Sequence, residues 1–206
     1  MVQPPTDPVH PSLEAEALQK MTGRPWHEYE DDGGVYYMFA GRSGRKLENP
    51  DAALNALRQH FGTDGVSMGP RNMPRVTEAA AKKYLDGIAG KPASIPDISA
   101  HFTLVPDPPE ILKLMTGHPW TDGKISSSKV LHLALPPGYE LADPSGAKRA
   151  LEELLKGQVL LQDRRPVAGE DRVIAYANAL SDDQWPSLHD QFVTKAKSRG
   201  PTPPGR

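Results

Sequence analysis

Acidic side chains cluster in one short stretch of the sequence, HEYEDD at residues 27–32. Carboxylates at this density can exchange protons with a substrate or hold a divalent cation. A second segment of the chain is similar in sequence, and its corresponding stretch reads TDGKIS, which keeps a single acid. We therefore interpret residues 27–32 as a solvated loop and not as a catalytic or metal site.

Basic side chains cluster in the stretch GRSGRK, which places Arg42, Arg45 and Lys46 among glycines. Such cations can contact the phosphate oxygens of a nucleic acid. The stretch lacks the G-x-x-x-x-G-K-[ST] spacing of a nucleotide-binding loop, and it lies between two expected strands instead of opening a helix. It is predicted to be a hairpin tip, and nucleic-acid contact through this tip stays an alternative function.

The sequence has few candidate nucleophiles or metal ligands at a recognisable spacing. None of the seven histidines has a partner at H-x-x-x-H or H-E-x-x-H spacing. The serines at 126–128 lack the G-x-S-x-G pattern of a catalytic elbow. The absence of cysteine excludes disulfides, thiol catalysis and cysteine-ligated metals. We expect no catalytic, cofactor-binding or metal-ligating residues, although ligands far apart in sequence stay an open alternative.

The overall charge gives no general attraction to nucleic acid or to an anionic membrane, because the net charge is −2 and the pI about 6.4. No apolar run approaches the ~20 residues that a membrane span needs. The N-terminal stretch MVQPPTDPVHP has neither the basic start nor the apolar centre of a signal peptide. We expect a soluble, intracellular (cytoplasmic) protein, with export by a route without a cleaved signal left open.

One sequence pattern occurs twice, as LQKMTGRPW at residues 18–26 and LKLMTGHPW at residues 112–120. With an offset of 94 residues the similarity runs without gaps over 45 positions, of which 13 are identical. Most of the identical residues set turns or have apolar side chains, as core residues do. The pattern predicts two tandem copies of one structural unit.

Each copy is predicted to be a helix–strand–turn–strand–helix unit, so the expected fold class is α+β with small antiparallel sheets packed by helices. Gly23 and Gly117 are placed to end the first helix in the left-handed conformation, and the prolines two positions later prevent its continuation. The pairs Asn49-Pro50 and Asp143-Pro144 predict the start of the second helix.

The predicted domain organisation follows from these copies. Unit one with an extra helix spans residues 11–90, and unit two with a hairpin and a final helix spans residues 108–198. A proline-rich linker is expected at 91–107, and proline-rich disordered tails at 1–10 and 199–206. After residue 156 we expect two strands, in QVLLQDRR and DRVIAYANAL, and then a helix at about 182–198.

The stretch VYYMFAGRSGRKLENPDAALNALRQHFG, residues 35–62, resembles the strand–loop–strand–helix segment of methyl-CpG-binding domains. The resemblance implies that Arg42, Arg45 and Lys46 lie near DNA. The second copy has Pro136, Tyr139 and Glu140 at the three basic positions. Since DNA affinity depends largely on phosphate neutralisation, this charge pattern disfavours a nucleic-acid partner.

Our main hypothesis is a non-enzymatic protein that binds a protein partner through the duplicated unit. The expected strands are apolar on both faces, so each face must be covered by helices, by the other copy or by a partner. Tyr36 and Met38, with Val130 and His132 in the second copy, are the candidate contact residues. The alternatives are burial against the units' own helices, nucleic-acid binding through residues 42–46 and the basic C-terminal tail, and an enzyme with a site between the halves.

Overall fold

The computed structural model describes residues 12–31, 33–89, 95–180 and 184–197. Its fold is α+β, with helices packed on small antiparallel sheets, as the sequence predicts. The chain divides into two compact units. The first contains Met1–Arg42 and Lys46–Val105, and the second contains Ser43–Arg45 and Pro106–Arg206. The predicted tails at 1–10 and 199–206 lie outside the described residues. No helix in the described part is long and apolar enough to cross a membrane.

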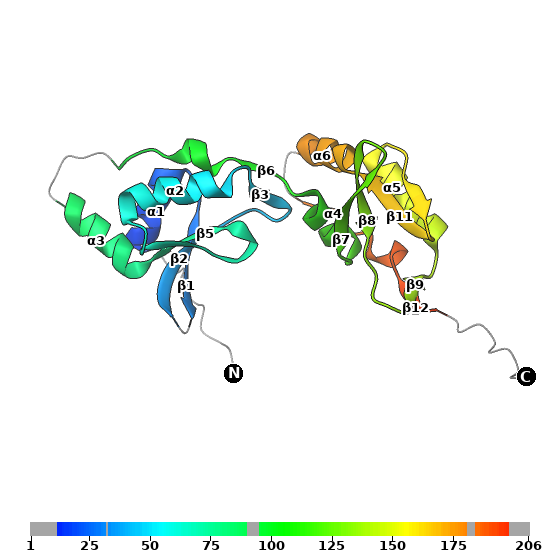
Figure 1. Cartoon of the computed structure of the whole chain (residues 1–206), viewed down its shortest axis with the longest axis horizontal. Helices are drawn as coiled ribbons and strands as arrows, with labels where there is room; N and C mark the ends of the chain where they lie inside the picture. Colours follow the sequence, from blue (N-terminus) through cyan, green and yellow to red (C-terminus); the bar gives the residue numbers. More distant parts are fainter. Residues whose placement is uncertain (1–11, 32, 90–94, 181–183, 198–206) are drawn as a thin grey trace, which may run out of the picture. The chain divides into compact units, whose positions relative to one another are not determined.

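The first unit begins with a helix, an antiparallel hairpin and a second helix, and then adds further strands and a third helix (Figure 1). Its elements are α1 (Leu13–Thr22), β1 (Trp26–Asp31), β2 (Gly34–Phe39), β3 (Arg45–Leu47), α2 (Pro50–Phe61), β4 (Val66–Met68), η1 (Pro70–Asn72), β5 (Pro74–Thr77), α3 (Glu78–Ile88), η2 (Ser99–Phe102) and β6 (Leu104–Pro106).

The main sheet of the first unit has the strand order β1-β2-β5-β4, and β3 pairs with β6 in a separate two-stranded sheet. All neighbours in the main sheet are antiparallel, with Tyr37 opposite Glu28 on one side and Val76 on the other. Every second side chain joins the core with the three helices. The core cluster contains Ala15, Leu18, Trp26, Tyr37, Phe39, Leu47, Ala53, Leu54, Leu57, Val66, Met73, Val76, Ala81 and Phe102. The helices therefore cover one face of this sheet.

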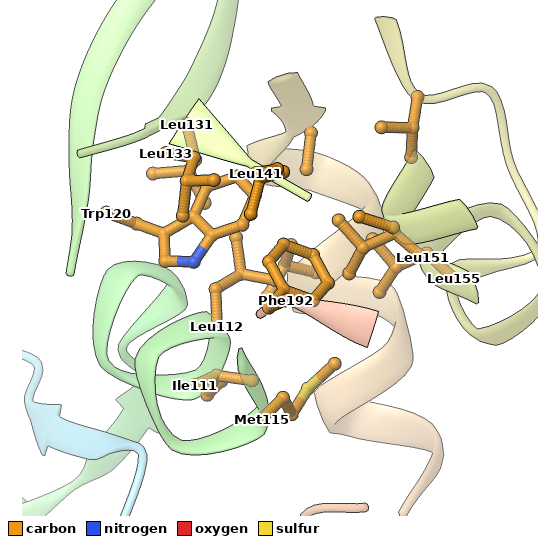
Figure 2. Packing of buried hydrophobic residues seen from close by; sticks show 14 of the residues in the cluster. Ile111, Leu112, Met115, Trp120, Leu131, Leu133, Leu141, Leu151, Leu155 and Phe192 are labelled. Carbon is orange, nitrogen blue, oxygen red and sulfur yellow. The ribbon is translucent and has the colours of Figure 1, made fainter. Parts of the chain in front are cut away.

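The second unit has the same order of elements except for η1. They are α4 (Pro108–Thr116), β7 (Trp120–Ile125), β8 (Ser128–Leu133), β9 (Tyr139–Leu141), α5 (Pro144–Leu155), β10 (Leu160–Gln162), β11 (Arg165–Gly169), α6 (Glu170–Ala179), η3 (His189–Gln191) and β12 (Thr194–Ala196). The strand order β10-β11-β8-β7 and the pairing of β9 with β12 match the first unit. Figure 2 shows the apolar core that these elements enclose, with Trp120, Leu141 and Phe192 turned into one cluster.

The stretch M-T-G-x-P-W forms the same joint in both units. Gly23 and Gly117 end α1 and α4 in the left-handed conformation, with φ of 66° and 74°. The next helices begin at the expected caps, since Asn49 and Asp143 accept hydrogen bonds from backbone N–H groups three residues later, at 3.0 Å and 2.9 Å. These turn and cap predictions are confirmed, because short-range backbone chemistry determines them.

The structural correspondence continues past the 45 aligned residues, to the last strand of each unit. The backbone N–H of Ile98 donates to the Met21 carbonyl at 2.8 Å, and the N–H of Leu188 donates to the Met115 carbonyl at 2.7 Å. The aromatic ring of Phe102 then lies 6.2 Å from that of Trp26, and the ring of Phe192 lies 6.2 Å from that of Trp120. The two units therefore share their architecture beyond residues 62 and 156, where the aligned sequences end.

Three segments differ from their predicted structure. DRVIAYANAL forms α6 instead of a strand, because Val173 and Ala177, four residues apart, are buried on one helical face. In place of a helix at 182–198, the described residues form η3 and β12. Proline at 186 disfavours a helix there, and Phe192 is buried in the core. The segment 91–107 contains η2 and β6, and its Phe102 belongs to the core of the first unit.

Candidate partner-binding faces

The sheet of the first unit has one face that its helices leave uncovered. Because side chains alternate along a strand, the residues between the core positions point to this opposite side. We call it the open face of the first unit; it carries His27, Tyr29, Asp31, Tyr36, Met38, Ser67 and Arg75. None of these residues belongs to the core cluster. The predicted contact residues Tyr36 and Met38 are therefore not packed against the unit's own helices.

Tyr36 is held at the centre of the open face by three neighbours. The guanidinium carbon of Arg75 lies 4.7 Å from the centroid of the Tyr36 ring, within the range of a cation–π contact. The Tyr29 ring lies 5.3 Å away on the adjacent strand. The Tyr36 hydroxyl donates a hydrogen bond of 2.9 Å to Asp31 Oδ2. Together these contacts leave Tyr36 only 8 % exposed, although it stands outside the core cluster of its unit.

Arg75 is fixed by polar contacts as well as by the ring. Its Nε donates to Ser67 Oγ at 2.8 Å, and its Nη1 lies 3.6 Å from Asp31 Oδ2. The Arg75 and Asp31 side chains are 34 % and 42 % exposed, so solvent weakens this ion pair. Its main effect is to orient the guanidinium over the Tyr36 ring. The open face thus presents a preorganised patch of Tyr29, Tyr36 and Arg75.

The titration behaviour of the patch follows from the same contacts. Hydrogen bonds from the Gly33 backbone N–H and from the Tyr36 hydroxyl lower the pKa of Asp31. Burial and the bond to Asp31 raise the pKa of Tyr36. Asp31 is therefore a carboxylate at neutral pH, and Tyr36 is a neutral phenol that donates its proton to it.

Met38 lies next to this patch, one residue beyond Tyr37 on β2. It is half-buried and pairs with His27 on one side and Arg75 on the other. A Cβ added at Gly69 would lie 3.5 Å from its sulfur, so the thioether extends toward the turn between β4 and β5.

The second unit also has a sheet face opposite its helices, which we call the open face of the second unit. It carries Thr121, Gly123, Ile125, Val130, His132, Leu160, Gln162, Arg165 and Val167. Val130 and Val167 are 7 % and 2 % exposed, yet neither belongs to the core cluster. The His132 ring covers Gly123, where an added Cβ would overlap it. Leu160 is exposed at 41 %.

The structure places the four predicted contact residues in two equivalent positions. Tyr36 and Val130 occupy the same place on β2 and β8, opposite Thr77 and Gly169. Met38 and His132 are likewise equivalent, opposite Arg75 and Val167. Tyr36 and Met38 therefore share one face of the first sheet, and Val130 and His132 share one face of the second, as the period of two predicts.

The predicted hairpin tip at residues 41–46 is wrong, because β3 pairs with β6 and not with β2. The basic residues of this stretch are engaged within the fold. Arg45 Nη2 donates to the carbonyl of Ala177 at 3.1 Å, and the nearby Ser43 carbonyl accepts from the Trp185 indole at 3.1 Å. Arg42, Arg45 and Lys46 all take part in further interactions. Arg45 and Lys46 begin the strand β3, so these two residues are part of the fold whether or not they also contact phosphates.

The acidic stretch at 27–32 is largely a strand and not the expected loop, since Trp26–Asp31 forms β1. Its residues after Trp26 are all exposed, because β1 lies at the edge of the sheet. Asp32 lies outside the described residues. Among the residues that the structure describes, no group of three or more histidines and acids could hold a metal ion.

No family model, curated protein or solved structure matches the chain.

Sequence reasoning missed Tyr29, Asp31, Ser67 and Arg75 as members of the open face. Tyr29 and Asp31 alternate with Glu28 and Glu30, a period of two that predicts a strand despite the polar composition. Arg75 gave no local signal, because its position beside Tyr36 depends on pairing between β2 and β5 across the intervening helix.

Proposed function

We propose that the protein is a non-enzymatic binding protein built from two copies of one α+β unit, and that it binds a protein partner through the open faces of its sheets. The observation that carries the proposal is the patch of Tyr29, Tyr36 and Arg75 on the sheet face opposite the core of its unit.

The duplication is supported by the shared framework of the two units. They have the same strand order, the same capped helices and the same contact between a tryptophan and a late phenylalanine. Such parallel detail over a whole unit is expected of two copies that descend from one sequence.

The composition of the patch favours a protein as the partner. Tyrosine, arginine and methionine are enriched in protein interfaces, and tyrosine and arginine dominate their binding energy. Tyr29 is exposed at 51 % and offers its ring to a partner. Because Tyr36 and Arg75 are already fixed by neighbours, they lose little side-chain entropy when a partner binds.

The two open faces carry different side chains at equivalent positions of the shared framework. Val130 and Val167 stand where the first unit has Tyr36 and Arg75, so the second face is apolar where the first is aromatic and charged. A duplicated scaffold with different surface chemistry can contact two parts of one partner, or two partners. It adds avidity when both faces engage together.

A nucleic acid is the less favoured partner. The cations of residues 42–46 contribute to the fold, and Lys195 in the C-terminal strand lies 3.7 Å from the Glu140 carboxylate. Duplex binding depends on phosphate neutralisation and is strongest at low salt. Measurable affinity for random duplex at low ionic strength would favour this alternative.

Site-specific photo-crosslinking in the producing cells tests the proposal. A crosslinking residue replaces Tyr29 in the full chain, and a matched control places it at Lys83, which is exposed on α3. We expect one protein adduct of defined mass from position 29, none from position 83, and a weaker adduct when Arg75→Gln is added. Equal adducts at both positions, or none at position 29, would contradict the proposal.

A further inference from the structure

The second unit contains a hollow of about 420 Å³ that the partner-binding proposal does not use. It lies beside the turn of the β10–β11 hairpin. Its lining consists of His132, Leu133, Gln162, Asp163, Arg165 and Lys197. Five of these six side chains are polar or charged, which distinguishes the hollow from the apolar surface around Val130.

A tight turn brings the polar side chains together. Asp163 and Arg164 both adopt the left-handed conformation, with φ of 48° and 62°, as in a two-residue hairpin turn. Gln162 and Arg165 are therefore directly opposite each other on the open face. The next strand supplies His132, which pairs with Val167 two residues from Arg165.

Lys197, another basic residue of the lining, comes from the end of the described chain. The backbone N–H of Lys197 donates to the Gly138 carbonyl at 2.8 Å, which fixes the strand end where its side chain reaches the hollow. Three segments far apart in sequence thus contribute to one lining.

The charge balance of the hollow is positive. Arg165 and Lys197 carry full charges, and Asp163 is the single acid of the lining. Within the described part of the chain, neither the Arg165 guanidinium nor the Lys197 ammonium makes a side-chain hydrogen bond or ion pair. The two cations thus keep their donors available at the edge of a concave surface.

The first unit shows that the fold does not require this chemistry. Met38 stands in the place of His132. Asp107, which follows β6 and belongs to the second unit, stands in the place of Lys197, because its N–H donates to the Gly44 carbonyl. Counting back from the equivalent strand pairs, Met73 stands in the place of Arg165. The Met38 thioether occupies the region near the turn, beside Gly69. The same framework therefore forms with methionines in place of His132 and Arg165 and with an acid in place of Lys197.

We propose that this hollow is a binding site for a small organic phosphate. A guanidinium offers paired N–H donors that match two phosphate oxygens, and an ammonium adds a compact positive charge. Gln162 supplies further donors at the wall, and the His132 ring forms part of the lining. A volume of about 420 Å³ exceeds that of a bare phosphate and lies in the range of small-ligand sites, so an organic body fits with the phosphate. The site is independent of the patch around Tyr36.

A titration of the ¹⁵N-labelled full chain tests the charge selectivity. The probes are phenyl phosphate, benzoate and benzamide, which share one ring and differ in the head group. We expect saturable amide shifts at His132, Gln162, Asp163 and Arg165 with phenyl phosphate, weaker ones with benzoate and none with benzamide. Shifts of equal size with neutral benzamide, or no shifts there with phenyl phosphate, would overturn the proposal.

Matched variants test the residues. Arg165→Gln removes a lining cation, whereas Arg164→Gln removes the neighbouring exposed cation that does not line the hollow. Loss of a charge-assisted contact should weaken phenyl phosphate binding about tenfold or more in the first variant and in Lys197→Gln. The Arg164→Gln affinity should be unchanged. Equal weakening in all three variants would show general charge attraction and overturn the site.

A peptide that carries phosphotyrosine separates a small-molecule ligand from a phosphorylated protein. The proposal expects it to bind no more tightly than phenyl phosphate, because the hollow encloses one small group. Much tighter binding of the peptide would overturn the small-molecule assignment.

Discussion

The indole Nε1 of Trp26 donates a hydrogen bond of 2.9 Å to the hydroxyl oxygen of Thr22. That hydroxyl donates its own hydrogen bond to the carbonyl of Leu18 at 2.8 Å, so the buried indole N–H and the Thr22 hydroxyl both have a partner. Trp120, Thr116 and Leu112 repeat the arrangement at 2.9 Å and 2.7 Å. The repeated sequence stretch is thus a joint between a helix and an edge strand, and it anchors each sheet to its helices.

Trp26→Ala and Trp120→Ala should each reduce the free energy of unfolding of the affected unit by about 3–5 kcal/mol, as for other buried aromatic residues. Thr22→Val keeps the shape but leaves the buried indole N–H without an acceptor, and should cost about 1–3 kcal/mol. Urea unfolding measures both effects. Thr63→Val, at an exposed loop position, is the control and should be close to neutral.

Gly23→Ala should destabilise the first unit by about 1 kcal/mol, because a side chain in the left-handed conformation is strained at this helix end. Gly87→Ala should have the opposite sign. Gly87 lies within α3 with open space where a Cβ would be added, so alanine favours the helix by about 0.5–1 kcal/mol. Thermal unfolding of the two variants shows whether each substitution raises or lowers the melting temperature. Stabilisation by Gly23→Ala would contradict the role of this glycine as a helix terminator.

Asp31 should make stability depend on pH on the acid side. Its folded pKa lies below the ordinary value of 3.8, because Gly33 and Tyr36 donate to the carboxylate. A depressed folded pKa gives a stabilisation that is fully present above the unfolded pKa and is lost as the pH falls through the folded pKa. Asp31→Asn should flatten this part of the profile, and Tyr36→Phe should flatten it partly. Unfolding free energies measured from neutral pH downward test this; an unchanged slope in Asp31→Asn would contradict it.

Much of the fold follows from local sequence signals. The glycine helix ends, the Asn-Pro and Asp-Pro helix starts and the α+β class depend on chemistry within a few residues, and all are present in the structure. The wrong predictions concern segments whose secondary structure depends on packing against the core. Val173 and Ala177 make DRVIAYANAL a helix by burying one face against the core, although its tyrosine, valine and isoleucine also suit a strand.

The candidate sites could be predicted only in part. Tyr36 and Met38, like Val130 and His132, share a face because strands have a period of two. The partners that shape these faces come from distant segments. Arg75 reaches Tyr36 across the β2–β5 pairing, and the hollow combines the β8 strand, the β10–β11 turn and the segment after β12. Such combinations depend on long-range pairing, which local sequence patterns do not encode.

The most direct test of the central claim measures partner binding and stability together in Tyr29→Ser and in the control Lys83→Ser. Tyr29 is exposed, so its replacement should cost about 1 kcal/mol or less in unfolding free energy, mostly from the lost ring contact with Tyr36. The tagged full chain is recovered from its producing cells after crosslinking. We expect that the amount of protein partner recovered with the native chain and with Lys83→Ser falls about tenfold or more with Tyr29→Ser. Full retention of the partner by a folded Tyr29→Ser chain would contradict it.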